Sequence, residues 1–223
     1  MLSLFRIIGD AVHLLSLVLL LRKILITSSC TGISLRTQEL YLIVFLTRYV
    51  DLFWNFQSLY NSAMKILFIA TTATIVYMIR TTYKASYQDY ITQDSLDYRF
   101  LIIPCAVLCL IWNEEPGGLF SSPFEISWAF SIYLEAIAIL PQCVLNRARK
   151  GLVDVLTADY VFCLGAYRLL YFLSWVLRWF FDETYIHSWI AFTGGIVQII
   201  LYCDFFYYYV ISRRTQKALQ LPF

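Results

Sequence analysis

Three ionisable residues share one face of a predicted helix near the start of this sequence. Arg6, Asp10 and His13 lie at positions i, i+4 and i+7 inside an apolar run, so a helix stacks them on one side. An ionisable residue at the centre of a membrane costs about 2.5–3.5 kcal/mol on insertion scales. Three of them on one helix predict compensation inside the protein, either from opposite charges or from a water-filled cavity.

Three further apolar segments carry polar stripes of the same kind. The stripes are Arg48, Asp51 and Asn55; Glu125, Trp128 and Glu135; and Tyr167, Tyr171, Ser174, Trp175 and Arg178. The other charges inside the predicted spans are Lys65, Arg168 and Asp204. Such stripes do not face lipid, so we expect all four to face one another around a water-filled cavity. The alternative is a set of interhelical pairs that only locks the helices together.

The charge types in this set indicate the chemistry of a ligand. Arg6, Arg48 and Arg178 are permanent cations, and a guanidinium group binds a carboxylate through two parallel hydrogen bonds. Asp51 and Glu125 have the charge to hold a cation at the other end of the cavity. We therefore expect a small ligand with several acidic groups, which is zwitterionic if it also carries that cation.

Aromatic residues and one histidine complete the predicted cavity. Trp128 and Trp175 suit stacking against a ligand or its cationic group, although each fits an anchor at the membrane interface equally well. An unperturbed histidine titrates at about pH 6.5. Beside Glu135 and Tyr167, His13 would couple ligand affinity to the pH of the compartment; the alternative is a hydrogen-bonded structural histidine.

The composition belongs to an integral membrane protein. Of 223 residues, 60% are hydrophobic and only 14% are charged, and the mean hydropathy is +0.67. A soluble domain of this length needs far more charge on its surface. We predict an all-α membrane protein that forms a single domain over residues 1–223, with a short basic cytosolic tail over about 212–223.

Apolar runs separated by polar breaks predict seven transmembrane helices, over roughly 4–21, 38–56, 62–79, 99–113, 124–143, 157–178 and 187–211. Basic residues gather on one side of such a bundle: Arg22, Lys23, Arg36, Arg80, Lys84, Arg99, Arg147, Arg149, Lys150, Arg213, Arg214 and Lys217. The opposite loops carry Glu114, Glu115, Asp182 and Glu183. By the positive-inside rule, the N-terminus is lumenal or extracellular and the C-terminus is cytosolic.

An internal echo suggests how the helices are arranged. "RYVDLFW" at 48–54 is loosely similar to "YRLLYFLSW" at 167–175. A parallel repeat of this kind predicts two parallel three-helix bundles joined by a linking helix, as in small sugar transporters.

Six motifs resemble the KDEL-receptor family, the receptors that retrieve escaped endoplasmic-reticulum (ER) proteins. They are "LFRIIGDAVHLL", "SCTGISLRTQELY", "TRYVDLFWNFQSLYNSAMK", "WAFSIYLEAIAILPQ", "YRLLYFLSWVLRW" and "VQIILYCDFFYYYV", and they span nearly the whole chain. The resemblance implies a seven-helix fold similar to SWEET and PQ-loop transporters. It implies as ligand the C-terminal Lys-Asp-Glu-Leu or His-Asp-Glu-Leu of a soluble cargo protein.

The resemblance also assigns roles to single residues. Arg48, with Tyr49 beside it, would meet the terminal carboxylate of the cargo. Arg6 and Arg178 would meet its two acidic side chains, and Trp175 would help to shape the pocket. The subsite for the first residue of the signal, Lys or His, would consist of Asp51, Glu125 and Trp128.

His13 of "GDAVHLL" is similar to the pH sensor of the family, with Glu135 and Tyr167 in the coupled network. The implied mechanism is capture of cargo in the mildly acidic Golgi and release in the near-neutral ER. The protein is therefore expected in ER and Golgi membranes. Capture would expose a cytosolic signal that binds the coat of retrograde vesicles.

The tail departs from the lysine-rich pattern of the family. It reads "SRRTQKALQLPF", without an adjacent lysine pair. Lys217 is the best match to the coat-binding lysine, and Arg213, Arg214 and Lys217 together are the expected coat-binding residues.

A transporter that moves a small anionic or zwitterionic solute through the same cavity is the alternative function. Three converging arginines favour the receptor, because they hold a carboxylate-rich ligand rather than let it pass. The sequence has no HExxH or GxSxG motif, so we expect no enzyme activity. We also expect no cofactor, no metal and no nucleic-acid partner.

Overall fold

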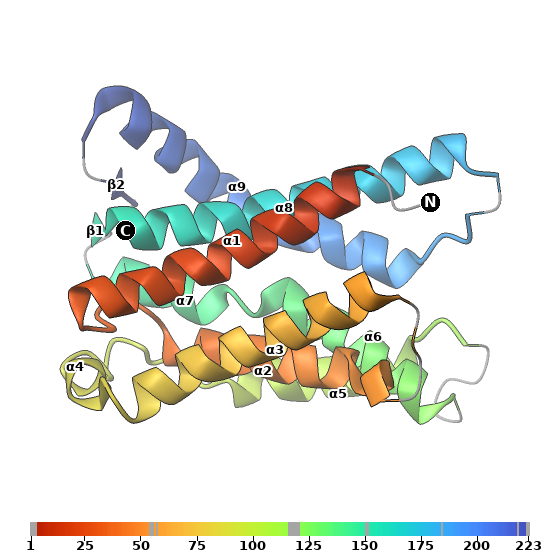
Figure 1. Cartoon of the computed structure of the whole chain (residues 1–223), viewed down its shortest axis with the longest axis horizontal. Coiled ribbons are helices and arrows are strands. Elements are labelled where there is room, and N and C mark those ends of the chain that lie inside the picture. The colour runs from red at the N-terminus through yellow and green to blue at the C-terminus, as the bar shows by residue number, and fades with distance from the viewer. Residues whose placement is uncertain are drawn as a thin grey trace.

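The computed structural model describes residues 4–53, 56, 58–115, 121–149, 152–183, 185–217 and 219–221. Asn55 of the second polar stripe and the basic-side residue Lys150 lie outside these residues. Helices make up most of the described chain, and Figure 1 shows the longest of them running side by side along the long axis of the molecule.

The elements in chain order are α1 Leu4–Thr27, α2 Leu35–Arg48, the 3-10 turn η1 Val50–Phe53, α3 Leu59–Arg80, α4 Lys84–Gln88, α5 Arg99–Ile111, α6 Pro123–Ile137, α7 Leu140–Ala148, β1 Leu152–Val153, α8 Val155–Phe181, α9 Trp189–Thr215 and β2 Leu219–Gln220. Serine side chains cap four of these helices: Ser34 at α2, Ser58 at α3, Ser122 at α6 and Ser188 at α9. Each accepts a hydrogen bond from a backbone N–H of the first turn, which satisfies a donor that the helix itself leaves unpaired.

Five segments within the described residues are long and apolar enough to cross a membrane: Leu4–Thr27, Leu59–Arg80, Pro123–Ala148, Val155–Phe181 and Trp189–Thr215. The third of these joins α6 and α7, and each of the five overlaps one predicted span. The chain is therefore an all-α, multi-pass membrane protein.

The two remaining predicted spans, 38–56 and 99–113, meet shorter helices. α2 has 14 residues and α5 has 13. The expected C-terminal end of the 38–56 span is wrong, because α2 ends at Arg48 and the chain tightens into η1 directly after it. Pro104 lies inside α5, where it removes one backbone hydrogen bond.

The helix contacts follow the same order in the two halves of the chain. In the first half, α3 packs against both α1 and α2; in the second half, α9 packs against both α6 and α8. Across the halves, α1 packs on α8 and α2 packs on α6, while α5 packs on α6. The first helix of each half therefore contacts the second helix of the other half.

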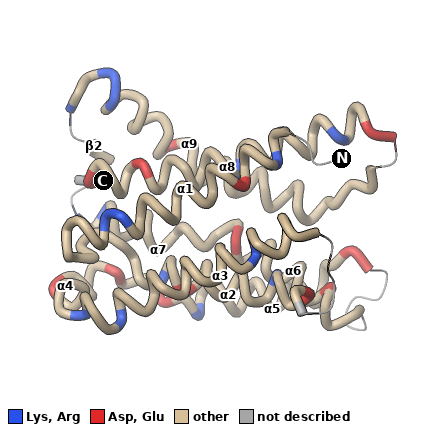
Figure 2. The backbone as a smooth tube through the Cα atoms, in the orientation of Figure 1, with Lys and Arg blue, Asp and Glu red and all other residues tan. Residues whose placement is uncertain are grey.

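Most loop lysines and arginines lie at one end of the bundle, together with several acidic residues, whereas the loops at the other end carry mainly acidic residues (Figure 2). One end, here called the basic end, comprises the α1–α2 loop, α4 and the C-terminal part of α9. The other, here called the acidic end, comprises the loops that follow α5 and α8, with Glu114, Glu115 and Asp182. The structure thus separates the charges into the two groups that the sequence predicts.

Buried hydrogen bonds fix the loops of the basic end. Asp94 is fully buried and accepts hydrogen bonds from Ser34 Oγ at 2.8 Å and from Tyr87 Oη at 2.8 Å. Gln142, in the first turn of α7, accepts a hydrogen bond from the backbone N–H of Ser34 at 2.8 Å. These contacts tie the α1–α2 loop to α7 and to the segment between α4 and α5.

The tail folds back onto the bundle. α9 continues to Thr215, and the following residues form β2, which pairs antiparallel with β1 through Leu152–Gln220 and Val153–Leu219. The side chain of Leu219, which pairs with Val153 across the two strands, is buried. The pairing buries an apolar side chain that a free tail would leave in water.

Candidate ligand-binding site

A cavity of about 300 Å³ lies in the half of the bundle toward the acidic end. Of the eleven residues predicted to bind ligand or sense pH, nine line it: Arg6, His13, Arg48, Tyr49, Trp128, Glu135, Tyr167, Trp175 and Arg178. They come from the first, second, sixth and eighth helices and the residue after α2. The four polar stripes thus meet around one space.

A buried carboxylate lies at the centre of the lining. Glu135 Oε2 lies 2.5 Å from Arg48 Nη1, and Glu135 Oε1 forms an ion pair with Arg168 and accepts a hydrogen bond from Tyr167 Oη at 2.6 Å. Arg48 also donates from Nε and Nη2 to Ser131, each at 3.1 Å. One carboxylate faces two guanidinium groups, so this part of the cavity keeps an excess of positive charge.

Arg168 is a site residue to which the sequence analysis gave no role. The sequence shows Arg168 as a charge inside a predicted span, but the polar stripe predicted on that helix begins at the adjacent Tyr167 and does not include Arg168. A spacing of seven residues places Arg168 and Trp175 on one helix face, and the guanidinium carbon lies 6.0 Å from the Trp175 ring. That spacing was the signal for its place in the cavity. Tyr185 and Ser188, which also line the cavity, follow α8 in a loop without such periodicity.

His13 is enclosed by aromatic rings. It stacks on Tyr167 with ring centroids 3.9 Å apart, and on Phe68 with centroids 4.5 Å apart. Its Nε2 atom is buried and has no hydrogen-bond partner among the described residues. Because Tyr167 also binds Glu135, a proton gained or lost on His13 acts on the same charged cluster.

Two more arginines lie nearer the acidic end. Arg6 donates to Asn61 Oδ1 at 3.2 Å. Arg178 lies over the ring of Tyr185 at 4.3 Å, and its Nη2 atom is 3.7 Å from Asp182. Within the described lining, four arginines therefore accompany one carboxylate. This arrangement attracts a ligand with several negative charges.

Asp10, the third member of the first stripe, has its own partners. Its carboxylate accepts hydrogen bonds from Tyr60 at 2.8 Å and from Tyr171. Asp10 is 5% exposed, so these hydroxyls replace the water that the carboxylate loses. Arg6 and His13 thus line the cavity as their shared helix face predicts, whereas Asp10 lies outside the described lining.

Asp51 and Glu125 are the two predicted residues outside the described lining. Both carboxylate oxygens of Asp51 accept from Lys65 Nζ at 2.8 Å. Glu125 Oε1 accepts from the backbone N–H of Glu114 at 3.2 Å, which ties the start of α6 to the preceding loop. No group of three His, Cys, Asp or Glu side chains in the described ranges is arranged to hold a metal ion.

The predicted coat-binding residues lie at the basic end, away from the cavity. Arg213 forms an ion pair with Asp159, which also accepts a hydrogen bond from Tyr209 at 2.7 Å. Arg214 is exposed, and the backbone carbonyl of Lys217 accepts a hydrogen bond from Ser212 Oγ at 2.6 Å.

Comparison with known proteins places the chain in one family. The sequence profile of the family described as "ER lumen protein retaining receptor" matches residues 29–178. The chain is 50% identical over 222 residues to ER lumen protein-retaining receptor A of Arabidopsis thaliana. It is 46% identical over 220 residues to the ER lumen protein-retaining receptor of Drosophila melanogaster, and 43% identical over 220 residues to receptor 2 of Bos taurus. Each alignment covers 99% of both chains.

Proposed function

The chain belongs to the family of ER lumen protein-retaining receptors, and from this premise we propose that its cavity binds the C-terminal retrieval signal of soluble ER proteins. The family consists of receptors, so the chain is a receptor for ER lumen proteins and not an enzyme. The observation that supports the ligand is the lining of four arginines and one carboxylate. A peptide that carries two acidic side chains just before its last residue, and a free terminal carboxylate, has the complementary charge.

The proposed binding mode places the peptide C-terminus deepest. Arg48 and Tyr49 bind the terminal carboxylate of the peptide. Arg48 is also the arginine whose guanidinium group forms an ion pair with Glu135 Oε2. Arg6 and Arg178 bind the two acidic side chains, and Trp175 shapes the wall between them. This order agrees with Arg178 lying beside the loop at the acidic end.

The first residue of the signal is proposed to bind at Trp128, Glu125 and Asp51. Trp128 lines the cavity, and Glu125 lies one helical turn before it on α6. Asp51 is paired with Lys65 without ligand, so its part in this subsite requires that pair to open. The indole and the two carboxylates together would recognise a cationic Lys or His side chain.

The finer architecture is part of the proposal. α2 with η1 and α5 would complete seven transmembrane helices in one domain: two parallel three-helix bundles, with α5 as the linking helix. The repeated contact order of the two halves supports this arrangement. By the positive-inside rule, the acidic end and the cavity face the lumen of the ER and Golgi, and the basic end faces the cytosol. There Arg213, Arg214 and Lys217 would bind the retrograde vesicle coat.

A direct binding measurement tests the proposed ligand. The full-length protein in lipid nanodiscs is titrated with peptides ending in Lys-Asp-Glu-Leu or His-Asp-Glu-Leu, at about pH 5.5 and about pH 7.2. Binding is expected to be tight at the acidic pH and weaker near neutrality. Amidation of the peptide C-terminus is expected to weaken it by at least about 30-fold, because a desolvated charge pair is lost.

Two outcomes would count against this function. If neither free-acid peptide binds at either pH, the proposed ligand is wrong, and flux of small anionic solutes into liposomes becomes the next measurement. If the amide binds as well as the free acid, the arginines do not read a terminal carboxylate.

Replacing His13 with Phe is expected to remove most of the pH dependence. The substitution keeps a ring between Tyr167 and Phe68 but cannot gain a proton. In the unmodified protein, protonation of His13 adds positive charge beside an acidic ligand, so affinity rises as the pH falls. In His13→Phe, the dissociation constant of the peptide should be nearly the same at the acidic pH and near neutrality, so the ratio of the two values should approach one.

His187 supplies the matched control, because the chain has two histidines and this one lies outside the described cavity lining. His187→Phe should keep the pH ratio of the unmodified protein. A His13→Phe protein that kept the full ratio would show that another group senses pH.

A further inference from the structure

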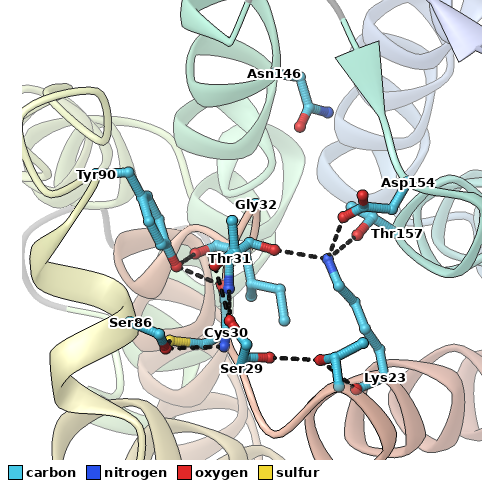
Figure 3. Close-up of polar contacts among 12 residues, drawn as sticks. Lys23, Ser29, Cys30, Thr31, Gly32, Ser86, Tyr90, Asn146, Asp154 and Thr157 are labelled. Carbon is cyan, nitrogen blue, oxygen red and sulfur yellow. Dashed lines mark hydrogen bonds and ion pairs between the residues drawn. The ribbon is translucent and has the colours of Figure 1, made fainter.

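Lys23 is buried at the basic end, although the sequence places it among exposed loop cations. It is 3% exposed, and Figure 3 shows its ammonium group among three oxygen atoms. Nζ donates to the carbonyl of Thr31 at 2.8 Å, to Asp154 Oδ2 at 2.7 Å and to Thr157 Oγ1 at 2.5 Å. An ammonium group has three N–H donors, so every donor of Lys23 has a partner.

These contacts join the end of α1 and the loop that follows it to the start of α8, which is distant in sequence. Lys23 lies in the last turns of α1, Thr31 lies in the α1–α2 loop, and Asp154 and Thr157 begin α8 (Figure 3). Among the helix pairs of the bundle, α1 and α8 share the most extensive contact. The same pair lines the ligand cavity ten residues earlier on α1, at His13, which is about 15 Å away along the helix.

The basic end is closed between the cavity and Lys23. Tyr41, Tyr160 and Tyr202 are almost completely buried in the middle of the bundle. A second cavity of about 280 Å³, here called the basic-end recess, has Lys23 and Asp154 in its wall. It shares no lining residue with the ligand cavity. The recess and the ligand cavity are therefore separate among the described residues, and Lys23 lies in the wall of the recess.

We infer that Lys23 is a positioning residue that holds the basic ends of α1 and α8 together, so that the ligand cavity opens at the acidic end only. The Lys23 side chain is 4% exposed, so separating it from Asp154 would leave an ammonium group buried without its counter-charge. A cavity with one opening retains a ligand instead of passing it across the membrane. In this respect the inference rests on the proposed function.

Cys30 reports on the state of these contacts. It immediately precedes Thr31 and is fully buried, with Sγ 3.0 Å from Ser86 Oγ and 3.4 Å from the carbonyl of Tyr83. Loss of the Lys23–Thr31 contact would remove one of the contacts that hold this loop, so the loop would open more often. The Cys30 thiol would then be accessible to a reagent dissolved in water.

The test measures how fast a membrane-impermeant maleimide modifies Cys30. The full-length protein in nanodiscs is treated without peptide, and labelling is read at each cysteine by mass spectrometry. Lys23→Gln is expected to raise the rate at Cys30 by at least about 10-fold, since the local opening becomes easier. Arg22→Gln removes the neighbouring exposed cation and should leave the rate unchanged.

Cys109 separates local opening from global unfolding. It is buried in α5, at 3% exposure, and does not contact the α1–α2 loop segment in any described hydrogen bond. Faster labelling at Cys30 alone supports the inference. Faster labelling at both cysteines means that the variant unfolds, and contradicts a local role for Lys23.

Two substitutions that each remove one partner of Lys23 test the inference if Lys23→Gln does not fold. Asp154→Asn removes the counter-charge and Thr157→Val removes one acceptor, and each should raise the Cys30 rate by a smaller factor. A folded variant set that labels at the unmodified rate overturns the inference. Peptide binding is measured separately, so a missing peptide signal would refute the proposed ligand without changing the labelling result.

Discussion

Replacing Arg48 with Gln is expected to lower the affinity for a free-acid peptide by about 30- to 5,000-fold, which corresponds to the loss of a desolvated charge pair worth about 2–5 kcal/mol. Arg48 is held in place on both sides: Nη1 contacts Glu135 and two other nitrogens donate to Ser131. Its guanidinium group is therefore oriented before a ligand arrives. A pre-oriented cation loses little side-chain freedom on binding, which makes its contribution large.

A thermodynamic cycle identifies the group that Arg48 binds. The unmodified protein and Arg48→Gln are each titrated with the free-acid peptide and its amide by isothermal calorimetry. If Arg48 binds the terminal carboxylate, amidation should cost the unmodified protein much affinity and cost the variant almost none. Arg99→Gln is the matched control, because Arg99 is 76% exposed at the basic end. Equal amidation costs in both proteins would assign the carboxylate to another arginine.

Replacing Glu135 with Gln is expected to destabilise the protein without ligand by about 3–5 kcal/mol, the usual cost of removing one partner from a buried ion pair. The Glu135 side chain is 2% exposed and ion-pairs with Arg48 and Arg168, whose side chains are 16% and 6% exposed. The variant leaves two cations close together with little water to solvate them. Their repulsion and lost hydration both favour unfolding.

The measurement is the midpoint of thermal unfolding in detergent, which should fall by about 10 °C. The double variant Glu135→Gln with Arg168→Gln removes one charge of each sign and should recover part of that loss. A saturating acidic peptide should also raise the midpoint of the single variant if that variant still binds it. A Glu135→Gln protein as stable as the unmodified one would mean that water already screens the two arginines.

The ligand cavity could be largely anticipated from the sequence, because an ionisable residue within an apolar span has few stable environments. Helical spacing then groups those residues on faces, and the faces of α1, α2, α6 and α8 do meet. Arg168 was given no role, because its partner Glu135 lies on another helix and adjacent Tyr167 carried the pattern. The Asp51–Lys65 pair depends on where α2 stops and η1 turns, which periodicity does not define.

The basic end was less predictable, since its contacts join segments far apart in the chain. Lys23 follows Arg22 and looks equally exposed, but its partner Asp154 is 131 residues away. Likewise, a two-residue strand such as β2 has no detectable alternation, so the pairing with β1 has no local signal. The positions of the long helices were predictable because many apolar residues contribute to each helix. The Lys23–Asp154 contact and the β1–β2 pairing each depend on one or two contacts.

The pairing of β2 with β1 has a practical consequence for fusion proteins. A fluorescent protein or affinity tag attached just beyond β2 would lie close in space to Val153 and to the start of α8, because β2 pairs with β1. Its bulk would compete with the burial of Leu219. A tag at the other terminus would lie close to Arg6 and the cavity lining. A reporter carried on a long flexible linker after β2 is therefore the design least expected to disturb either end of the bundle.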